Sequence, residues 1–375
     1  MKEIGVGIIG WGFMGRTHAH ALREMPLFYP GAGFRPVIRS VCSRRVDAVK
    51  AAAEILGATH FTGDYRETLA RPDIDVVSIS TPNALHEAMI LDALKAGKHL
   101  YIDKPLTVDA DSADRIERVA REAGLLTQMA FNNRFFPSVL RAKQLIDEGR
   151  IGNILSFSAR YDHSGSIDAR KPAGWKMLED AGVLLDLGSH ALDMLAFLIG
   201  YPQRVLCRLR TLYPERPLPG GGVAANVSDD QAVMILEMPG GAVGTATASK
   251  ITTGAEDELS FEIHGDRGAL RWRLTEADYL DFFDNTLPET ALGGERGYRR
   301  IASTARYPAP GGSFLPPKNR VGWDRAHMHS YYSFLDAVRR GVPASPDIFE
   351  GARLQRLMDA MVRSHRESAW VDFSR

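Results

Sequence analysis

The chain has 375 residues, 45% hydrophobic and 25% charged, and its 46 basic and 46 acidic residues balance. This length favours two domains, and the composition is that of a globular protein. A formal net charge of zero argues against a broad nucleic-acid-binding surface. No apolar run reaches the ~18 residues of a membrane span. Cys42 and Cys207 form neither a disulfide framework nor a metal spacing. Because the N-terminal segment also has no signal-peptide pattern, we expect a cytoplasmic protein without nucleic-acid or membrane partners.

The first third of the chain alternates short apolar strands with amphipathic helices. The pattern predicts strands at Ile4–Ile9, Pro36–Cys42, Asp75–Ser80, His99–Ile102 and Leu125–Ala130, and helices at Phe13–Met25, Arg45–Leu56, Asn83–Ala96 and Ala110–Ala123. Such alternation with short loops is typical of a doubly wound parallel sheet. The loops that follow the strands then gather along one edge. We predict that residues 1–130 form such a domain.

The remainder of the chain has a different pattern. Strands are predicted at Ile154–Tyr161, Val205–Leu212, Gln231–Glu237, Val243–Lys250, Leu259–His264 and Ala269–Leu274, and helices at Ser138–Glu148, Ala191–Ile199, Asp324–Arg340 and Glu350–Arg366. Successive strands joined by tight turns favour antiparallel pairing. Residues 131–375 are therefore predicted to form an α/β domain with a large, mostly antiparallel open sheet, and Thr286–Gly322 is expected to be irregular.

A glycine-rich turn, Gly10-Trp-Gly-Phe-Met-Gly15, joins the first predicted strand to the first helix. In this context the pattern is typical of a dinucleotide-binding loop, because glycines let the backbone approach a pyrophosphate at the helix N-terminus. The same pattern also occurs in turns that bind nothing. We predict NAD(P) contacts at Gly10, Gly12, Phe13, Met14 and Gly15.

The end of the second strand reads Cys42-Ser43-Arg44-Arg45 and has no acidic residue. A carboxylate there would accept a hydrogen bond from the ribose 2′-hydroxyl of NAD, whereas Ser43 and Arg44 can hold the 2′-phosphate of NADP. The arginines also fit the solvated start of a helix. The pattern slightly favours NADP over NAD.

Three further side chains suit hydride transfer from an alcohol. Lys104 follows a buried strand and can polarise a substrate oxygen, although a lysine is more often a solvated surface residue. Asp186 and His190 are four residues apart and share a helix face if the helix begins by Leu185. A histidine beside a carboxylate can act as a general base. Taken alone, the pair also fits a helix cap and a core histidine.

Five motifs occur in order: the glycine turn, Thr81-Pro-Asn-Ala-Leu-His86, Asp103-Lys-Pro105, Asn133-Arg-Phe135 and Gly182-Val-Leu-Leu-Asp-Leu-Gly-Ser-His190. In these motifs, and over nearly its whole length, the chain resembles the Gfo/Idh/MocA oxidoreductases, which include glucose–fructose oxidoreductase and inositol dehydrogenase. The resemblance implies a Rossmann domain followed by an α/β domain, with Lys104, Asp186 and His190 as the catalytic set. It departs at Asp103, where the family usually has glutamate.

The resemblance extends the predicted site. It implies cofactor contacts at Thr81, Pro82, Asn83, His86, Asp103 and Lys104, and substrate contacts at Lys104, Asp186 and His190. Arg134 is a candidate to anchor a ligand or to brace the junction between the domains. His163 and Trp175 lie in a polar, aromatic segment that either contacts a sugar ring or forms an ordered surface loop. No metal site is expected, because His327 and His329 point to different helix faces.

Together these features predict an NAD(P)-dependent dehydrogenase or reductase of a sugar, an inositol or a related cyclic polyol. A redox-cycling glycosidase could use the same residues without net change in NAD(P)H. A non-catalytic dinucleotide-binding sensor would not need all three catalytic side chains. An open sheet is expected to expose an apolar face that a symmetric interface covers, which predicts a homodimer or homotetramer. The substrate depends on loops that the sequence pattern does not define.

Overall fold

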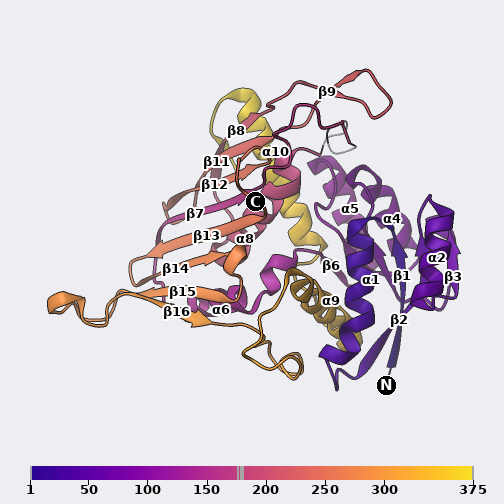
Figure 1. The fold of residues 1–375 in the computed structure, drawn as a ribbon, viewed down its shortest axis with the longest axis horizontal. Coiled ribbons are helices and arrows are strands. Elements are labelled where there is room, and N and C mark those ends of the chain that lie inside the picture. The colour runs from indigo at the N-terminus through magenta and orange to yellow at the C-terminus, as the bar shows by residue number, and fades with distance from the viewer. Residues whose placement is uncertain (1, 175–176, 178–180, 374–375) are drawn as a thin grey trace. The chain divides into compact units, whose positions relative to one another are not determined.

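The computed structural model describes residues 2–174, 177 and 181–373. Its contacts divide the chain into two compact units (Figure 1), Met1–Phe135 with Ala305–Arg356 and Phe136–Thr304 with Leu357–Arg375. The chain thus returns to the first unit after building most of the second. The predicted domain ranges, 1–130 and 131–375, stay a prediction.

The first unit contains a six-stranded parallel sheet in the order β3-β2-β1-β4-β5-β6. Its strands are β1 (Lys2–Ile9), β2 (Phe34–Cys42), β3 (His60–Thr62), β4 (Val76–Ile79), β5 (His99–Ile102) and β6 (Thr127–Met129). Its helices are α1 (Phe13–Phe28), α2 (Val46–Leu56), α3 (Tyr65–Leu69), α4 (His86–Lys95), α5 (Ala110–Ala123) and α9 (Trp323–Arg340). The strand order reverses between β1 and β4, which is where such sheets bind ligands at the carboxyl ends of their strands. The predicted Rossmann fold is confirmed.

The strands of this sheet are apolar because both faces are covered. Val6, Ile8, Val76 and Val77 are each 0% exposed, as expected for a parallel sheet between helices. Helix α9 packs against α1 and adds Tyr331 and other aromatic side chains to this core.

Helix α1 is longer than predicted. Pro26 was expected to end the helix after Met25, but α1 runs through it to Phe28. Proline removes one N–H donor from the ladder. Because Tyr29 N still donates to Met25 O at 3.0 Å, the last turn remains closed.

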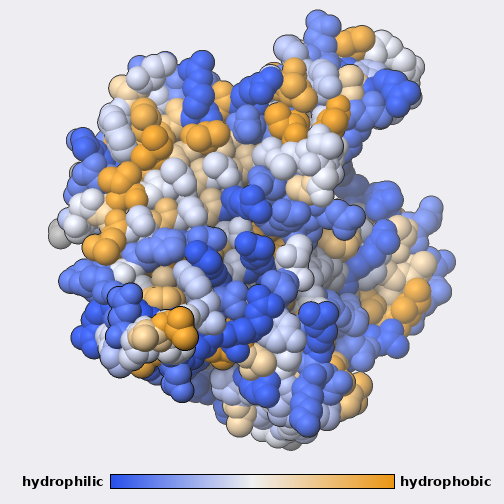
Figure 2. Space-filling model, turned by 60° about the vertical axis from the view of Figure 1, so that its left-hand side comes forward, coloured by the Kyte–Doolittle hydropathy of each residue, from blue (hydrophilic) through white to orange (hydrophobic). Residues whose placement is uncertain are grey.

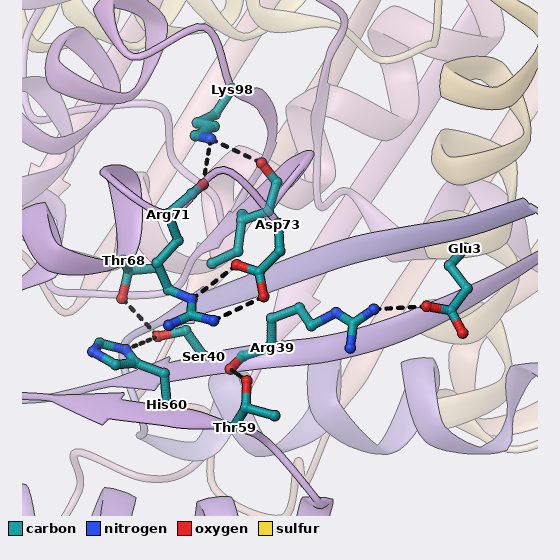
Figure 3. Close-up of polar contacts among 10 residues, drawn as sticks. Glu3, Arg39, Ser40, Thr59, His60, Thr68, Arg71, Asp73 and Lys98 are labelled. Carbon is teal, nitrogen blue, oxygen red and sulfur yellow. Dashed lines mark hydrogen bonds and ion pairs between the residues drawn. The ribbon is translucent and has the colours of Figure 1, made fainter.

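Polar contacts brace the amino-terminal end of the sheet (Figure 3). Just before β5, Lys98 Nζ donates to Arg71 O at 2.8 Å and to Ile74 O at 2.9 Å. The Arg71 guanidinium in turn pairs with Asp73 at 2.8 Å. These contacts fix the loop that enters β4, while the opposite, carboxyl edge carries the predicted site.

The second unit contains a nine-stranded sheet in the order β16-β15-β14-β13-β7-β12-β11-β8-β17. Its strands are β7 (Ile154–Asp162), β8 (Arg204–Arg210), β11 (Gln231–Glu237), β12 (Val243–Ser249), β13 (Glu258–Gly265), β14 (Gly268–Arg273), β15 (Tyr279–Asp284), β16 (Tyr298–Ala302) and β17 (Val371–Asp372), with a separate hairpin of β9 (Glu215–Pro217) and β10 (Val223–Ala225). Helices α6 (Pro137–Asp147) and α8 (Ser189–Ile199) belong to this unit, and α10 (Ile348–Glu367) belongs to both units. The predicted large, mostly antiparallel sheet is confirmed.

One pair of strands in this sheet is parallel. Strands β7 and β12 run side by side with Asp162 opposite Ser249. The residues that follow them, His163 and Lys250, therefore leave the sheet at the same edge. The sequence pattern did not reveal this pairing, because the strands are distant in the chain.

The exposed face of the sheet is more polar than expected. Its central strands point hydroxyl and charged side chains outward, around a hollow lined by Ser158, Arg160, Thr245, Thr247, Glu262 and Arg271. Exposed apolar residues such as Val233 and Val243 are scattered along these strands. Figure 2 likewise shows hydrophobic residues in small groups among hydrophilic ones. A solvated antiparallel face readily accepts serine, threonine and arginine, and the expected apolar patch on this face stays a prediction.

The segment 286–322 is also more ordered than predicted, because it contains β16, which pairs with β15.

In the described part of the chain, no helix is both long and apolar enough to cross a bilayer.

Candidate active site

The glycine turn after β1 is locked in place by neighbouring strands. Gly10 has a φ of +103°, and a Cβ on it would lie 2.4 Å from Ser80 O. Gly10 N donates to Cys42 O at 2.9 Å, while Ser80 Oγ donates to Gly10 O at 3.1 Å. Only glycine meets both the left-handed backbone and the close approach. The turn is therefore held at the switch point between β1 and β4.

The N-terminus of α1 is suited to an anion. Its N-cap is Gly12, no side chain caps it, and its first turn has no acidic residue. A Cβ on Gly12 would meet no atom within 4 Å. The first N–H groups of a helix need acceptors and carry partial positive charge. An uncapped helix start beside open space thus fits the pyrophosphate of a dinucleotide.

The end of β2 presents Ser43 and Arg44. Ser43 N donates to Thr62 O at 3.1 Å, and Ser43 Oγ accepts from Arg45 N at 3.4 Å. Arg44 is exposed. Within the described residues we find no ion pair or hydrogen bond of its side chain, so the guanidinium is available to a phosphate.

The loop after β4 carries Thr81, Pro82 and Asn83, of which Asn83 is 8% exposed and begins a short 3-10 turn. His86 is 0% exposed; its Nε2 lies 2.9 Å from Thr81 O and its Nδ1 3.1 Å from Pro105 O. Burial lowers the pKa of His86, and Asp103 opposes that shift. His86 therefore ties the loops after β4 and β5 together, and a direct cofactor contact by this side chain stays a prediction.

Asp103 and Lys104 follow β5 at the same edge of the sheet. Asp103 is 8% exposed, and its Oδ1 accepts from Lys104 N at 2.8 Å. The aspartate that replaces the family's usual glutamate thus caps the backbone of the lysine itself. Lys104 is half-buried, and the backbone that presents it is held on both sides because Asp103 N donates to Ile79 O at 2.8 Å.

Arg134 is 4% exposed and pairs with Glu350 Oε1 at 2.9 Å within the first unit. This contact ties the turn after β6 to the start of α10. Because both residues lie in the first unit, bracing of the junction between the domains and a ligand contact by Arg134 both stay predictions.

In the second unit, Asp186 and His190 lie on consecutive turns. Asp186 belongs to a π-helical turn, η3 (Leu184–Gly188), that leads directly into α8, and His190 is 8% exposed on the first turn of α8. Wide turns of this kind are rare and are frequent at functional sites. The condition set from the sequence, that helical backbone begins by Leu185, is met because η3 begins at Leu184.

Asp229 anchors the start of η3. Its Oδ2 accepts from Leu184 N at 2.8 Å, and its O accepts from Val183 N at 2.8 Å. A Cβ on Gly182 would lie 1.9 Å from Asp229 Oδ1, so only glycine fits there. Burial raises the pKa of Asp229, and the Leu184 N–H bond opposes this shift.

Lys250 forms an ion pair with Asp186, with Nζ and Oδ2 3.0 Å apart and side-chain exposures of 17% and 15%. Sequence reasoning missed this lysine. Lys250 is the last residue of the predicted strand Val243–Lys250, which resembles the position of Lys104 after its strand, but the parallel pairing of β12 with β7 was not visible.

Tyr161 adjoins His190, and His163 adjoins Tyr161. The ring of Tyr161 lies 5.6 Å from that of His190, edge to face. His163 Nε2 lies 2.9 Å from Asp257 Oδ1. Burial and a hydrogen bond to Asp257 raise the pKa of Tyr161. The hydrogen bonds from His163 and Tyr161 outweigh burial and lower the pKa of Asp257.

The remaining candidates are placed as follows. Trp175 lies outside the described residues. His327 and His329 are both buried in α9, and among the described residues no group of three His, Cys, Asp or Glu side chains is placed to hold a metal. A second residue that sequence reasoning missed is Trp323, whose ring stacks on that of Phe13 at 5.5 Å. The return of the chain to the first unit brings it to the glycine turn.

Comparison with known proteins identifies the class. The oxidoreductase-family model with an NAD-binding Rossmann fold matches residues 4–131. The model of the C-terminal α/β domain of the same family matches residues 143–373. The chain is an NAD(P)-dependent oxidoreductase. It belongs to the Gfo/Idh/MocA family.

Relatives cover the whole chain. A levoglucosan dehydrogenase of Pseudarthrobacter phenanthrenivorans is 31% identical over 99% of this chain and 98% of its own length. A scyllo-inositol 2-dehydrogenase (NADP(+)) of Bacillus subtilis is 25% identical over 99% and 96%. The structure of levoglucosan dehydrogenase with NADH and levoglucosan matches with a TM-score of 0.94 and 31% identity over 100% of both chains. An oxidoreductase domain protein from Kribbella flavida matches at 0.95 and 30%, again over 100% of both.

Proposed function

We propose that this protein is a dehydrogenase of a sugar, an inositol or a related cyclic polyol. The observation that carries the proposal is the uncapped start of α1 beside open space at Gly12, in the unit that also presents Lys104 at the carboxyl edge of its sheet. The relatives named for levoglucosan and inositol dehydrogenases support the substrate class.

The chemistry divides among three side chains. When bound, the dinucleotide supplies the hydride acceptor in oxidation. His190 accepts the proton of the substrate hydroxyl at a ring nitrogen, which such a base can speed by ~10²–10⁴. Lys104 donates a hydrogen bond to the same oxygen and stabilises the negative charge that develops there. Asp186 fixes the charge state of His190.

For the cofactor we propose a preference for NADP. Support comes from the exposed guanidinium of Arg44 and from Ser43 where a ribose-binding carboxylate would stand. Relatives are named for both cofactors, so the choice depends on these two residues.

For assembly we propose a homodimer or homotetramer through the second unit. The outward face of its sheet is broad and carries several exposed valines among its polar side chains. Light scattering at micromolar concentration checks this, and a monomer would contradict it.

The proposed function is tested by incubating the enzyme with NADP or NAD and a panel of levoglucosan, inositols and simple sugars, reading nicotinamide absorbance. We expect net reduction of the cofactor with at least one member of the panel. Consumption of a glycoside without net reduction would instead support a redox-cycling glycosidase. Cofactor binding without turnover of any member would support a sensor.

A further inference from the structure

Lys250 is held more firmly than a surface lysine. Its N donates to Asp230 O at 2.9 Å, and its O accepts from Ser166 N at 2.8 Å. Its ammonium lies 3.0 Å from Asp186 Oδ2, and both side chains are mostly buried. The backbone and the charged end of Lys250 are therefore both fixed beside the π-helical turn that carries Asp186.

We propose that Lys250 is a positioning residue that holds the Asp186 carboxylate and thereby sets the proton affinity of His190. The inference rests on the proposed role of His190 as the base. Lys250 itself need not contact the substrate, because its partner is the carboxylate one helical turn before the histidine.

The direction of the effect follows from charge. An ionised Asp186 favours protonated His190 and raises its pKa, whereas a cation bound to Asp186 offsets that influence. With Lys250 in place, His190 stays neutral nearer to physiological pH and is free to accept a proton. Removal of the Lys250 charge should raise the pKa of His190, so His190 would be protonated and unable to act as a base over a wider pH range.

The other charged groups around α8 have partners of their own. On β7 and its neighbours, Asp257 pairs with His163 and Asp162 faces Arg160. On α6, Arg141 pairs with Glu148 and Lys143 with Asp147. In the part of this region that the structure describes, further ionisable groups are Tyr161, Asp229 beneath η3 and the buried Asp193 of α8. Lys250, in contrast, forms its ion pair with Asp186.

Direct titration of His190 tests the proposal without a known substrate. Protein carrying ¹³Cε1-labelled histidine is titrated by NMR, and His190→Ala identifies the resonance. Lys250→Met should raise the titration midpoint of His190 by about one pH unit. Lys250→Arg, which keeps the charge, should leave it near the wild-type value, and Asp186→Asn should lower it.

A matched control is Arg150→Met. It removes a cation from Asp284, which is 9% exposed and lies 2.9 Å away on β15, three strands from β7. This control should leave the His190 midpoint unchanged. Thermal unfolding of each variant confirms that it is folded. If Lys250→Met does not fold, Lys250→Arg still tests the effect of the charge. A His190 midpoint that changes in Lys250→Arg would contradict the proposal.

An unchanged or lowered midpoint in folded Lys250→Met would overturn the inference while leaving the proposed function intact. Retained turnover in His190→Ala, with whichever panel member is oxidised, would instead remove the proposed role of His190. The two failures are therefore distinguishable.

Discussion

Gly15 packs against the carbonyl of Gly10 so closely that a Cβ on Gly15 would lie 2.0 Å from Gly10 O. At Gly12, three residues earlier, the same added atom would meet nothing within 4 Å. The two glycines of this motif are thus suited to their positions for different physical reasons. Gly15 is required by the fold of the turn, and Gly12 leaves space for a ligand.

This difference predicts opposite outcomes for two alanine variants. Gly15→Ala should destabilise the first unit, because backbone must move to admit the methyl group. Gly12→Ala should keep the wild-type melting temperature, since Gly12 has a φ of −86° that any residue adopts, but should weaken dinucleotide binding about ten-fold or more. Calorimetric unfolding and fluorescence titration with NADPH measure the two effects. Equal loss of stability in both variants would contradict this interpretation.

Cofactor preference depends on Ser43 and Arg44. Arg44→Ala should weaken NADP binding and leave NAD binding nearly unchanged, because only NADP carries the 2′-phosphate. Ser43→Asp should shift preference toward NAD by repelling that phosphate. Lys50→Ala, which removes an exposed cation elsewhere on α2, is the control. A wild-type protein that binds NAD about ten-fold tighter than NADP, ~1.4 kcal/mol, would refute the prediction.

Three of the buried histidines in the first unit predict acid sensitivity. Burial lowers the pKa of His18 to about 4, with Asp103 opposing, and that of His329 to about 3, with Arg325 adding to the effect. Burial also lowers the pKa of His327 well below its usual range. All three stay neutral in the folded protein, whereas in the unfolded chain they take up protons below about pH 6.5. The unfolded state therefore binds more protons, and stability falls as the pH falls.

Near pH 5 the three histidines should change the free energy of unfolding by about 4 kcal/mol per pH unit. Urea unfolding between pH 7 and pH 5 measures the slope. His327→Phe removes one of the three groups and should reduce the slope by about a third. A free energy of unfolding that stays constant over this range would show that these histidines are not neutral and buried as described.

Much of the first unit could be predicted from its sequence, because parallel strands covered on both faces are short apolar runs and helices such as α2 and α5 end at glycines, Gly57 and Gly124. The three-residue strand β3 was missed since His60–Thr62 is too short to show a period. Helix α1 also extends through Pro26, and it packs against α9, a partner far away in the sequence that no local pattern reveals.

Candidate site residues could be proposed from the sequence where they lie next to a strand or helix end, as with Lys104 and the Asp186–His190 pair, and their roles stay predictions. Contacts between residues far apart in the sequence could not be predicted. Trp323 reaches Phe13 because α9 joins the first unit, and Lys250 reaches Asp186 because β12 pairs in parallel with β7. Neither pairing leaves a local pattern in the sequence.

The central claim is that His190 and Lys104 act on the reacting oxygen while the glycine turn binds the dinucleotide. Its most direct test measures NADPH affinity, turnover and the pH profile of oxidation for His190→Ala, Lys104→Ala and the double variant. We expect nearly unchanged affinity, turnover lower by about two to four orders of magnitude in each single variant, and a less than additive loss in the double variant. The near-neutral limb of the pH profile should disappear in His190→Ala. Near-normal turnover with an unchanged profile in His190→Ala would contradict the account and make His163 or His86 the next base to test.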